Sequence, residues 1–425
     1  MKMEKVKIKN IGRVITGKTP PTSKSEFFNG DYPFITPSDI NDYKIRRISL
    51  AERKLSEKWR VKASNYLLPN NTICYVCIGS TVGKSCLTSG ESFSNQQINA
   101  LVCDETKANY GFIFYLLKNK TNEIKRITDS SGVGKGIINK TSFENLDIEI
   151  PGLPTQTRIA SVLSTYDDLI EVNEKRIKAL EEMAQRIYTE WFVKFKFPGH
   201  EKARMVDSGT EYGLIPEGWE VKTLSEVMHF VRGRSYSSEQ ISDTGGDYYI
   251  VNLKSFNRGG GFRFDGEKYY SGPVNDDQYL QQGDVVVAVT DMTNDRAVIA
   301  RPARVPRISS QRVTFSADVV KMISEKIPSS FIYYCLFDHR FTEATKQKAN
   351  GANVLHLKPA AILEYRTVIP SIDMLNEFEK KCHGIFGMID VCLERNQALA
   401  KTRDLLIPQL VTGKRELKAD HVKSN

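Results

Sequence analysis

Apolar side chains recur at alternating steps of three and four residues along two long stretches of the chain. In the first stretch these positions are Leu163, Tyr166, Ile170, Asn173, Ile177, Leu180, Ala184, Ile187 and Trp191. In the second stretch, 219 positions further on, they are Cys382, Ile385, Ile389, Cys392, Asn396, Leu399, Arg403, Leu406 and Leu410. This alternation is the a/d seam of a heptad repeat and predicts two long amphipathic helices, the first from about residue 155 to residue 194.

Each seam needs a partner surface, because a heptad helix cannot bury its apolar stripe alone. Two equivalent helices in one chain can bury each other, most simply as an antiparallel pair with a domain at either end. Packing of each stripe on its own domain is the alternative. Among the polar members of the seams, Asn173 and Asn396 are expected to fix the register at some cost in stability. A helix of this length would span roughly 60 Å, which suits a ruler between two domains.

The remainder of the chain is β-rich and irregular. Short runs of strand-forming residues at 66–68, 72–78, 284–289 and 313–315 alternate with glycine-rich turns, and one helical segment is expected near 110–127 and another near 330–348. The predicted fold class is therefore α/β (α+β), with two mixed α/β domains alternating with two long helices that pack as an antiparallel coiled coil.

The two halves of the chain repeat each other. FIFYLL at 112–117 returns as FIYYCL at 331–336, and GDYPFIT at 30–36 returns as GDYYIVN at 246–252, with Gly17 and Gly233 in the same frame. A period this long indicates a duplicated domain-plus-helix unit with pseudo-two-fold symmetry, not a solenoid. The aperiodic stretch 198–213 between the halves has the composition of a linker.

Composition changes this picture in one respect. The formal net charge of +9 over 425 residues is the usual footprint of a protein that meets polyanions. No apolar run approaches the length of a membrane span and no signal peptide is evident, so a cytoplasmic protein is expected. The few cysteines suit a reducing compartment, and the C-x-x-C of Cys74 and Cys77 lacks the second pair that a zinc site needs.

The heptapeptide GSTVGKS at 79–85 follows a strand-like run and resembles a phosphate-binding loop. That loop requires four residues between the first glycine and the Gly-Lys pair, and it opens into a helix. Here there are three residues, and the following segment has the pattern of a strand end and a turn. Sequence signatures of a methyltransferase, a helicase or a hydrolase are also lacking. The sequence therefore favours recognition over catalysis.

The chain resembles the specificity subunit of a type I restriction-modification system. The resemblance is carried by the helical stretch LPTQTRIASVLSTYDDLIEVNEKRIKALEEMAQRIYTEWFVKF, by GLIPEGWE at the start of the second half and by the closing LLIPQLVTGK, and it covers nearly the whole chain. It implies target recognition domains at 1–150 and 212–369, helical spacers at 151–197 and 370–414, a linker at 198–211 and a C-terminal tail at 415–425.

By this resemblance the chain is a non-catalytic subunit that binds double-stranded DNA. Each recognition domain would read one half of a bipartite, asymmetric site, and the helices would set the spacer and dock two modification (methyltransferase) subunits. Restriction (endonuclease/translocase) subunits join in the full complex. S-adenosylmethionine, ATP and Mg are expected only in those partners, and neither a cofactor nor a metal in this chain. In related domains a Gly-Ser-Thr-x-Gly-Lys turn follows a strand, so GSTVGKS is expected to shape a loop near DNA.

Candidate DNA contacts are basic or amide side chains in loops, since Lys and Arg bind phosphates, Arg pairs with guanine, and Asn or Gln pairs with adenine. In the first domain they are Lys18, Lys24, Lys84, Gln96 and Lys135; in the second they are Arg232, Arg234, Arg258, Arg263, Asn294, Arg296, Arg307, Gln311 and Arg312.

Two other classes of function stay open on the sequence. One is a duplicated DNA-binding scaffold of another defence or regulatory system. The other is a nucleotide-binding enzyme that uses the GSTVGKS loop.

Overall fold

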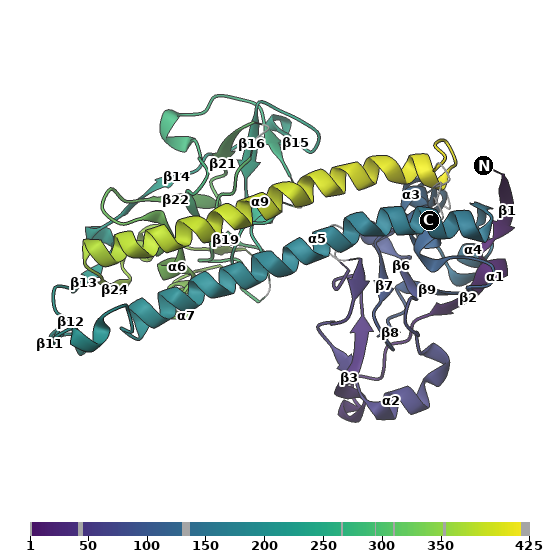
Figure 1. Ribbon diagram of the computed structural model, residues 1–425, viewed down its shortest axis with the longest axis horizontal. Coiled ribbons are helices and arrows are strands. Elements are labelled where there is room, and N and C mark those ends of the chain that lie inside the picture. Colours follow the sequence, from purple (N-terminus) through teal and green to yellow (C-terminus); the bar gives the residue numbers. More distant parts are fainter. Residues whose placement is uncertain are drawn as a thin grey trace, which may run out of the picture. The chain divides into compact units, whose positions relative to one another are not determined.

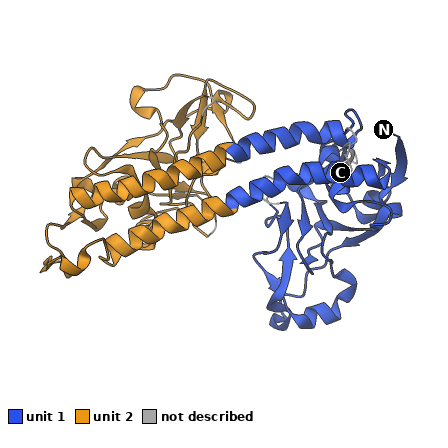
Figure 2. Ribbon diagram, in the orientation of Figure 1, with its two compact units in different colours: residues 1–174, 395–425 blue, residues 175–394 orange. Residues whose placement is uncertain are grey.

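The computed structural model describes residues 2–40, 46–129, 137–264, 267–293, 295–308, 311–351 and 354–417. The chain divides into two compact units (Figure 2). Unit 1 comprises residues 1–174 and 395–425, and unit 2 comprises residues 175–394. Each unit therefore combines one β-rich domain with a segment of both long helices.

The domain of unit 1 is built on a five-stranded sheet in the order β2-β9-β6-β7-β4 (Figure 1). Its strands are β2 (Gly12–Thr16), β9 (Ile98–Cys103), β6 (Ile73–Val76), β7 (Ser85–Thr88) and β4 (Arg47–Ile48). A three-stranded sheet, β5-β3-β8, consists of Lys54–Leu55, Phe28–Ile35 and Phe93–Ser94, and β1 (Met3–Lys7) pairs with β10 (Asp147–Pro151). The helices of this domain are α1 (Ile8–Ile11), α2 (Glu57–Lys62), α3 (Tyr110–Asp129) and α4 (Lys140–Glu144).

The domain of unit 2 has two four-stranded sheets. One is β14-β22-β18-β20 (His229–Arg232, Val319–Ile323, Val285–Ala288, Pro302–Arg304), and the other is β15-β17-β16-β21 (Ile241–Ser242, Tyr269–Tyr270, Tyr248–Val251, Arg312–Phe315). Three two-stranded ladders join β13 (Glu220–Thr223) to β24 (Arg366–Ile369), β11 (Met205–Asp207) to β12 (Leu214–Pro216), and β19 (Thr290–Asp291) to β23 (Leu355–His356). Its helices are α6 (Ser329–Phe337), α7 (His339–Lys346) and α8 (Ala360–Leu363).

Strand pairing confirms the duplication. Glu4 pairs with Ile150 in the ladder β1·β10, and Glu220 pairs with Ile369 in β13·β24. The antiparallel pair β2·β9 likewise corresponds to β14·β22, and the parallel pair β3·β8 corresponds to β16·β21. Positions 216 apart near the start of each repeat and 219 apart near its end thus have the same place in the fold.

The two long helices are α5 (Leu153–Tyr188) and α9 (Ile372–Val411). In unit 1, Asn173 donates from Nδ2 to Asn396 Oδ1 at 2.8 Å, and Asp167 forms an ion pair with Arg403 at 2.5 Å. In unit 2, the ring of Trp191, just beyond α5, lies 6.1 Å from that of Phe378. Contact positions fall along α9 as they rise along α5, so the predicted antiparallel packing is confirmed within each unit.

The ends of these helices follow from local chemistry. Pro154 stands in the first turn of α5, where no N–H is needed for the helix. After Tyr188 the chain makes a π-helical turn over Thr189–Val193, so the α-helix stops short of the predicted residue 194. Beyond α9, Gly413 adopts the left-handed conformation (φ 74°) that commonly ends a helix.

The cores follow the same division. In unit 1, residues 112–117 of α3 pack with Leu163 of α5 and Leu410 of α9; in unit 2, Phe331 of α6 packs with Tyr188 and Phe378.

Among the described residues, no helix is long and apolar enough to cross a membrane. All seven cysteines are free, and no metal-binding cluster of His, Cys, Asp or Glu occurs in the described ranges.

Candidate nucleic-acid interface

A glycine followed by a basic residue occupies the same place in both domains. A Cβ atom on Gly17 would lie 2.3 Å from the Ser94 carbonyl oxygen, and one on Gly233 would lie 2.0 Å from the Ser316 carbonyl oxygen. Only glycine lets the backbone pass this close. The repeat noticed in the sequence therefore reflects a packing requirement at the end of β2 and of β14.

The basic residue after each glycine lies over a tyrosine ring. Lys18 Nζ is 5.2 Å from the ring centre of Tyr66, and the Arg234 guanidinium is 4.7 Å from that of Tyr270. A cation at this distance is attracted to the face of an aromatic ring. At this position each domain thus presents a cation that lies over a neighbouring ring.

Around Lys18 the surface of the first domain carries amide side chains. Thr19 Oγ1 donates to Gln96 Oε1 at 2.6 Å, and Asn95 Nδ2 donates to Gln97 Oε1 at 3.0 Å. The Lys18 N–H donates to the carbonyl of Ser94, which directly precedes these amides. The structure therefore brings two predicted contacts, Lys18 and Gln96, to one place.

In the second domain a group of tyrosines extends from Tyr270. The Tyr248 ring centre lies 6.3 Å from that of Tyr270 and 5.9 Å from that of Tyr279, and the Arg312 guanidinium lies 5.5 Å from the Tyr279 ring. A hydrogen bond with Tyr279 raises the pKa of Tyr248. We call Arg234, Arg312 and these three tyrosines the arginine–tyrosine cluster.

Two further predicted residues flank the arginine–tyrosine cluster. Gln311 donates from Nε2 to the Gly246 carbonyl at 2.8 Å, and the Arg232 carbonyl accepts from Gln278 Nε2 at 3.1 Å. Gln311 directly precedes Arg312, and Arg232 is two residues before Arg234. Four of the predicted contacts of this domain therefore lie together: Arg232, Arg234, Gln311 and Arg312.

A second group of predicted residues lies on two loops that touch each other. Arg258 forms an ion pair with Asp295, and the Gly259 N–H donates to the Ala297 carbonyl at 2.9 Å. Arg296 is exposed on the second loop, and Arg263 is partly exposed after the turn that carries Arg258. Asn294 lies outside the described residues.

Asp291 organises this second loop and was not singled out from the sequence. Its carboxylate is 1 % exposed and accepts hydrogen bonds from the N–H and hydroxyl of Thr293 and from the N–H groups of Val298 and Ile299, all at 2.7–2.8 Å. Burial acts to raise the pKa of Asp291, but these hydrogen bonds outweigh it and lower the pKa below its ordinary value. The sequence signal that could have identified Asp291 is its position as a carboxylate shortly after a buried strand, Val285–Ala288.

The other predicted residues are dispersed. GSTVGKS forms the hairpin between β6 and β7, and Lys84 donates to the Ile40 carbonyl at 3.3 Å. The segment after Lys84 is a strand, so no helix N-terminus is available there to bind a phosphate. Exposed Lys24 lies 5.8 Å from the ring centre of Phe27. Lys135 lies outside the described residues.

Arg307 belongs to the attachment of the domain to α9. Its Nε lies 3.3 Å from Glu394, and nearby Arg304 donates two hydrogen bonds to Asp390, at 2.9 and 3.0 Å. Gln282 donates to the same carboxylate at 2.6 Å. These contacts fasten the β-rich domain of unit 2 to the helix.

The first domain is fastened by different residues. Arg46 pairs with Asp168 at 2.6 Å, and the Tyr115 hydroxyl donates to Asp167, which also binds Arg403. Burial, together with the nearby charge of Asp167, raises the pKa of Tyr115, so its hydroxyl stays protonated and able to donate. None of these attachments was predicted from the sequence.

Most of the predicted seam is buried in the helix pair. The buried members are Leu163, Ile170, Ile177, Leu180, Ala184, Trp191, Cys382, Ile385, Ile389, Cys392, Asn396, Arg403 and Leu410. The partly buried members are Tyr166, Asn173, Ile187, Leu399 and Leu406. Near the end of each helix the stripe shifts by one residue, because Tyr188 and Ile407 are buried where Ile187 and Leu406 are only partly so.

Comparison with known proteins identifies the class. The family described as "Type I restriction modification DNA specificity domain" matches residues 1–182 and 216–374, and the chain belongs to this family. The type I restriction enzyme MjaIX specificity subunit of Methanocaldococcus jannaschii is 27% identical over 412 residues, which are 96% of this chain and 92% of that protein. The MjaVIII specificity subunit of the same organism is 24% identical over 432 residues, 98% of this chain and 93% of that protein.

The fold is also that of a solved structure. The crystal structure of the type I restriction-modification S subunit from M. genitalium superposes with a TM-score of 0.53 at 15% identity and covers 96% of both chains. At this level of identity the likeness establishes the fold alone.

Proposed function

We propose that this chain is the DNA-recognition subunit of a type I restriction-modification complex. Residues 1–150 and 212–369 act as target recognition domains, and each reads one half of a bipartite DNA site. The observation that carries the proposal is that the specificity family matches both repeats, and that both repeats hold a cation over a tyrosine at the same place in the fold.

The two half-sites differ, because the side chains beside the repeated cation differ. The first domain offers the amides of Asn95, Gln96 and Gln97, and side-chain amides pair with adenine. The second offers Arg234 and Arg312, and arginine pairs with guanine or binds phosphates. An asymmetric site follows from this difference.

The helical spacers, 151–197 and 370–414, set the distance between half-sites and dock two modification subunits, to which restriction subunits are added in the full complex. Methyl transfer and ATP-dependent cleavage belong to those partners, together with S-adenosylmethionine, ATP and Mg. The relatives are named as specificity subunits of type I restriction enzymes, which supports this division of labour. The complex works on cellular DNA and is therefore placed in the cytoplasm.

A domain exchange tests the proposal. Residues 1–150 are replaced by the corresponding domain of a relative, and the methylated sequences produced with the modification subunits are mapped by single-molecule sequencing. One half-site should change while the other and the spacer stay as they were. A change in both half-sites, or in neither, would contradict the assignment of one domain to one half-site.

A further inference from the structure

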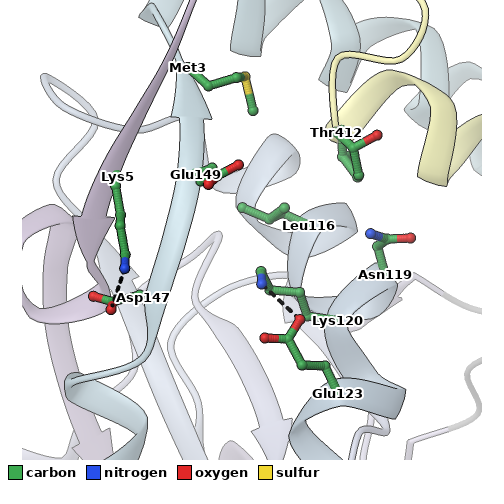
Figure 3. A pocket seen from close by; sticks show the side chains of 10 residues that line it. Met3, Lys5, Leu116, Asn119, Lys120, Glu123, Asp147, Glu149 and Thr412 are labelled. Atoms are coloured by element: carbon green, nitrogen blue, oxygen red, sulfur yellow. Dashed lines mark hydrogen bonds and ion pairs between the residues drawn. The ribbon is translucent and has the colours of Figure 1, made fainter.

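A cavity of about 370 Å³ opens in unit 1 between the β1·β10 ladder, α3 and the C-terminal end of α9 (Figure 3). None of the candidate DNA contacts lines it. Its apolar lining comes from Met3 of β1, Leu116 of α3 and Val411 of α9. All its lining residues belong to unit 1.

The charged side chains that line this cavity form two ion pairs, and one carboxylate, that of Glu149, belongs to neither pair. Lys5 pairs with Asp147 at 3.0 Å, and Lys120 pairs with Glu123 at 2.9 Å (Figure 3). Glu149 is exposed and forms no ion pair with any residue that the structure describes. The cavity thus combines an apolar surface with an unneutralised negative charge.

The equivalent place in unit 2 is filled. By the offsets of the repeat, Met3 corresponds to Trp219, Val411 to Phe192 and Glu149 to Val368. These three counterparts are only 6 %, 5 % and 4 % exposed and belong to one hydrophobic core. Among the residues that the structure describes, the first repeat therefore leaves open a site that the second repeat covers.

The covering segment in unit 2 is the chain that leaves α5. The Trp219 ring centre lies 5.7 Å from that of Phe195 and 5.0 Å from that of Phe197. These two aromatic residues alternate with Lys194 and Lys196, both exposed. After α9 the positions equivalent to Phe195 and Phe197 are occupied by Lys414 and Glu416, so the chain has no aromatic residue at those positions.

We propose that the cavity in unit 1 is a docking site for a segment of a partner subunit in which aromatic side chains alternate with lysine or arginine. The aromatic side chains would pack on Met3, Leu116 and Val411, as Phe195 and Phe197 pack in unit 2. A cation of the segment would pair with Glu149, which stands where unit 2 has an apolar valine. The inference rests on the proposed function only in that it requires partner subunits.

The chain's own covering segment supplies a probe. A fluorescein-labelled peptide of residues 192–199, FVKFKFPG, is titrated with the full chain and its anisotropy is followed. Saturable binding is expected, and Glu149→Lys should weaken it by up to about fivefold, the scale of one exposed ion pair. Glu105→Lys makes the same charge change at an exposed position that does not line the cavity and should leave binding unchanged. A peptide with both Phe195 and Phe197 replaced by serine should not bind.

Competition then identifies the occupant. Purified modification and restriction subunits, added to form the complex, should displace the peptide. Peptide that stays bound in the full complex would overturn the proposal, as would the absence of saturable binding or an equal effect of the two lysine substitutions. Binding that appears only after residues 418–425 are deleted would assign the site to the chain itself. Anisotropy that falls again as the chain concentration is raised would assign it to a second copy. Both results would also overturn the proposal.

The outcome is separable from that of the domain exchange. Glu149→Lys alters none of the candidate DNA contacts, so the half-sites methylated by a complex carrying it should be those of the unchanged chain. Changed half-site bases would count against the proposed division of recognition, whereas the peptide titration alone decides the docking site.

Discussion

Asp291 is a buried carboxylate whose hydrogen bonds hold the loop that carries Arg296. Asn in its place would keep one acceptor oxygen but would turn an NH₂ group towards backbone N–H donors. We expect Asp291→Asn to lower the free energy of unfolding by about 1–3 kcal/mol, the usual cost of buried groups left unsatisfied. Urea titration of the full chain measures it. Asp295→Asn, which removes only the exposed ion pair with Arg258, should cost no more than about 1 kcal/mol.

The same carboxylate predicts a dependence on pH. Its pKa in the folded chain is lowered, so its contribution to stability is complete above the unfolded-state pKa, about 3.9, and is lost as the pH falls through the folded-state pKa. The stability difference between the unchanged chain and Asp291→Asn should therefore be constant from pH 7 to about pH 5 and shrink below about pH 4. A difference that grew on acidification would contradict this assignment.

Arg312 in the arginine–tyrosine cluster is exposed and is suited to a phosphate contact. We expect Arg312→Ala, in the assembled complex, to weaken binding of specific and unrelated DNA alike. The slope of log K against log salt should become less steep by about 0.9, the contribution of one phosphate. The measurement is anisotropy of labelled duplexes between low and moderate salt. Arg204→Ala, which removes an exposed arginine paired with Glu217, serves as the control and should leave the slope unchanged.

Sequence alone could locate part of this interface. The repeat placed Gly17 and Gly233 in one frame, and the basic residue after each was recognised. Their ring partners, Tyr66 and Tyr270, could not be recognised, because each lies far from its cation in the sequence and is brought to it only by the fold. Ion pairs such as Arg304 with Asp390 escaped for the same reason: nothing local in the sequence distinguishes them from solvated charges.

At the scale of elements, heptad spacing was sufficient to predict both long helices and their antiparallel packing. It failed at the end of α5, where the predicted seam position Ile187 is less buried than Tyr188. Tyr188, Trp191 and Phe192 all join the core of unit 2, at the i, i+3, i+4 spacing of a single helix face.

The asparagine pair predicts a test of register. Asn396→Leu alone leaves the Asn173 amide without its partner, and Asn173→Leu alone leaves Asn396 with only its bond to Glu174; each should cost about 1–2 kcal/mol. The double substitution should recover most of that loss, because leucine at both seam positions packs without an unsatisfied amide. A double-mutant cycle in urea measures the coupling. Additive losses would show that the two amides act independently and do not set the register together.

At the scale of the whole molecule, the chain passes between the two units only within the helices, at 174–175 in α5 and at 394–395 in α9. The repeat in the sequence predicted two domains and two helices. It gave no sign that each unit would contain part of both helices, because that depends on which helix segments pack on which domain. The attachments are Arg46 with Asp168 in unit 1 and Arg304 with Asp390 in unit 2.

These two crossing points define where the proposed spacer can be lengthened without disturbing either attachment. A second copy of residues 168–174 is inserted after Glu174, and a second copy of residues 395–401 is inserted before Arg395. Seven residues preserve the heptad phase of both seams and create a second matched asparagine pair. Each helix gains about 10 Å, at 1.5 Å per residue.

Because duplex DNA advances about 3.4 Å per base pair, the spacer of the methylated sites should grow by up to about three base pairs. The half-site bases should not change, since no recognition loop is altered. Methylated sites made with the modification subunits are mapped by single-molecule sequencing. Insertion into α5 alone is the control: it shifts one seam against the other and should abolish methylation without creating a longer spacer. An unchanged spacer in the double insertion would mean that the helices dock partners but do not set the distance between half-sites, because lengthening both helices should move the two recognition domains further apart.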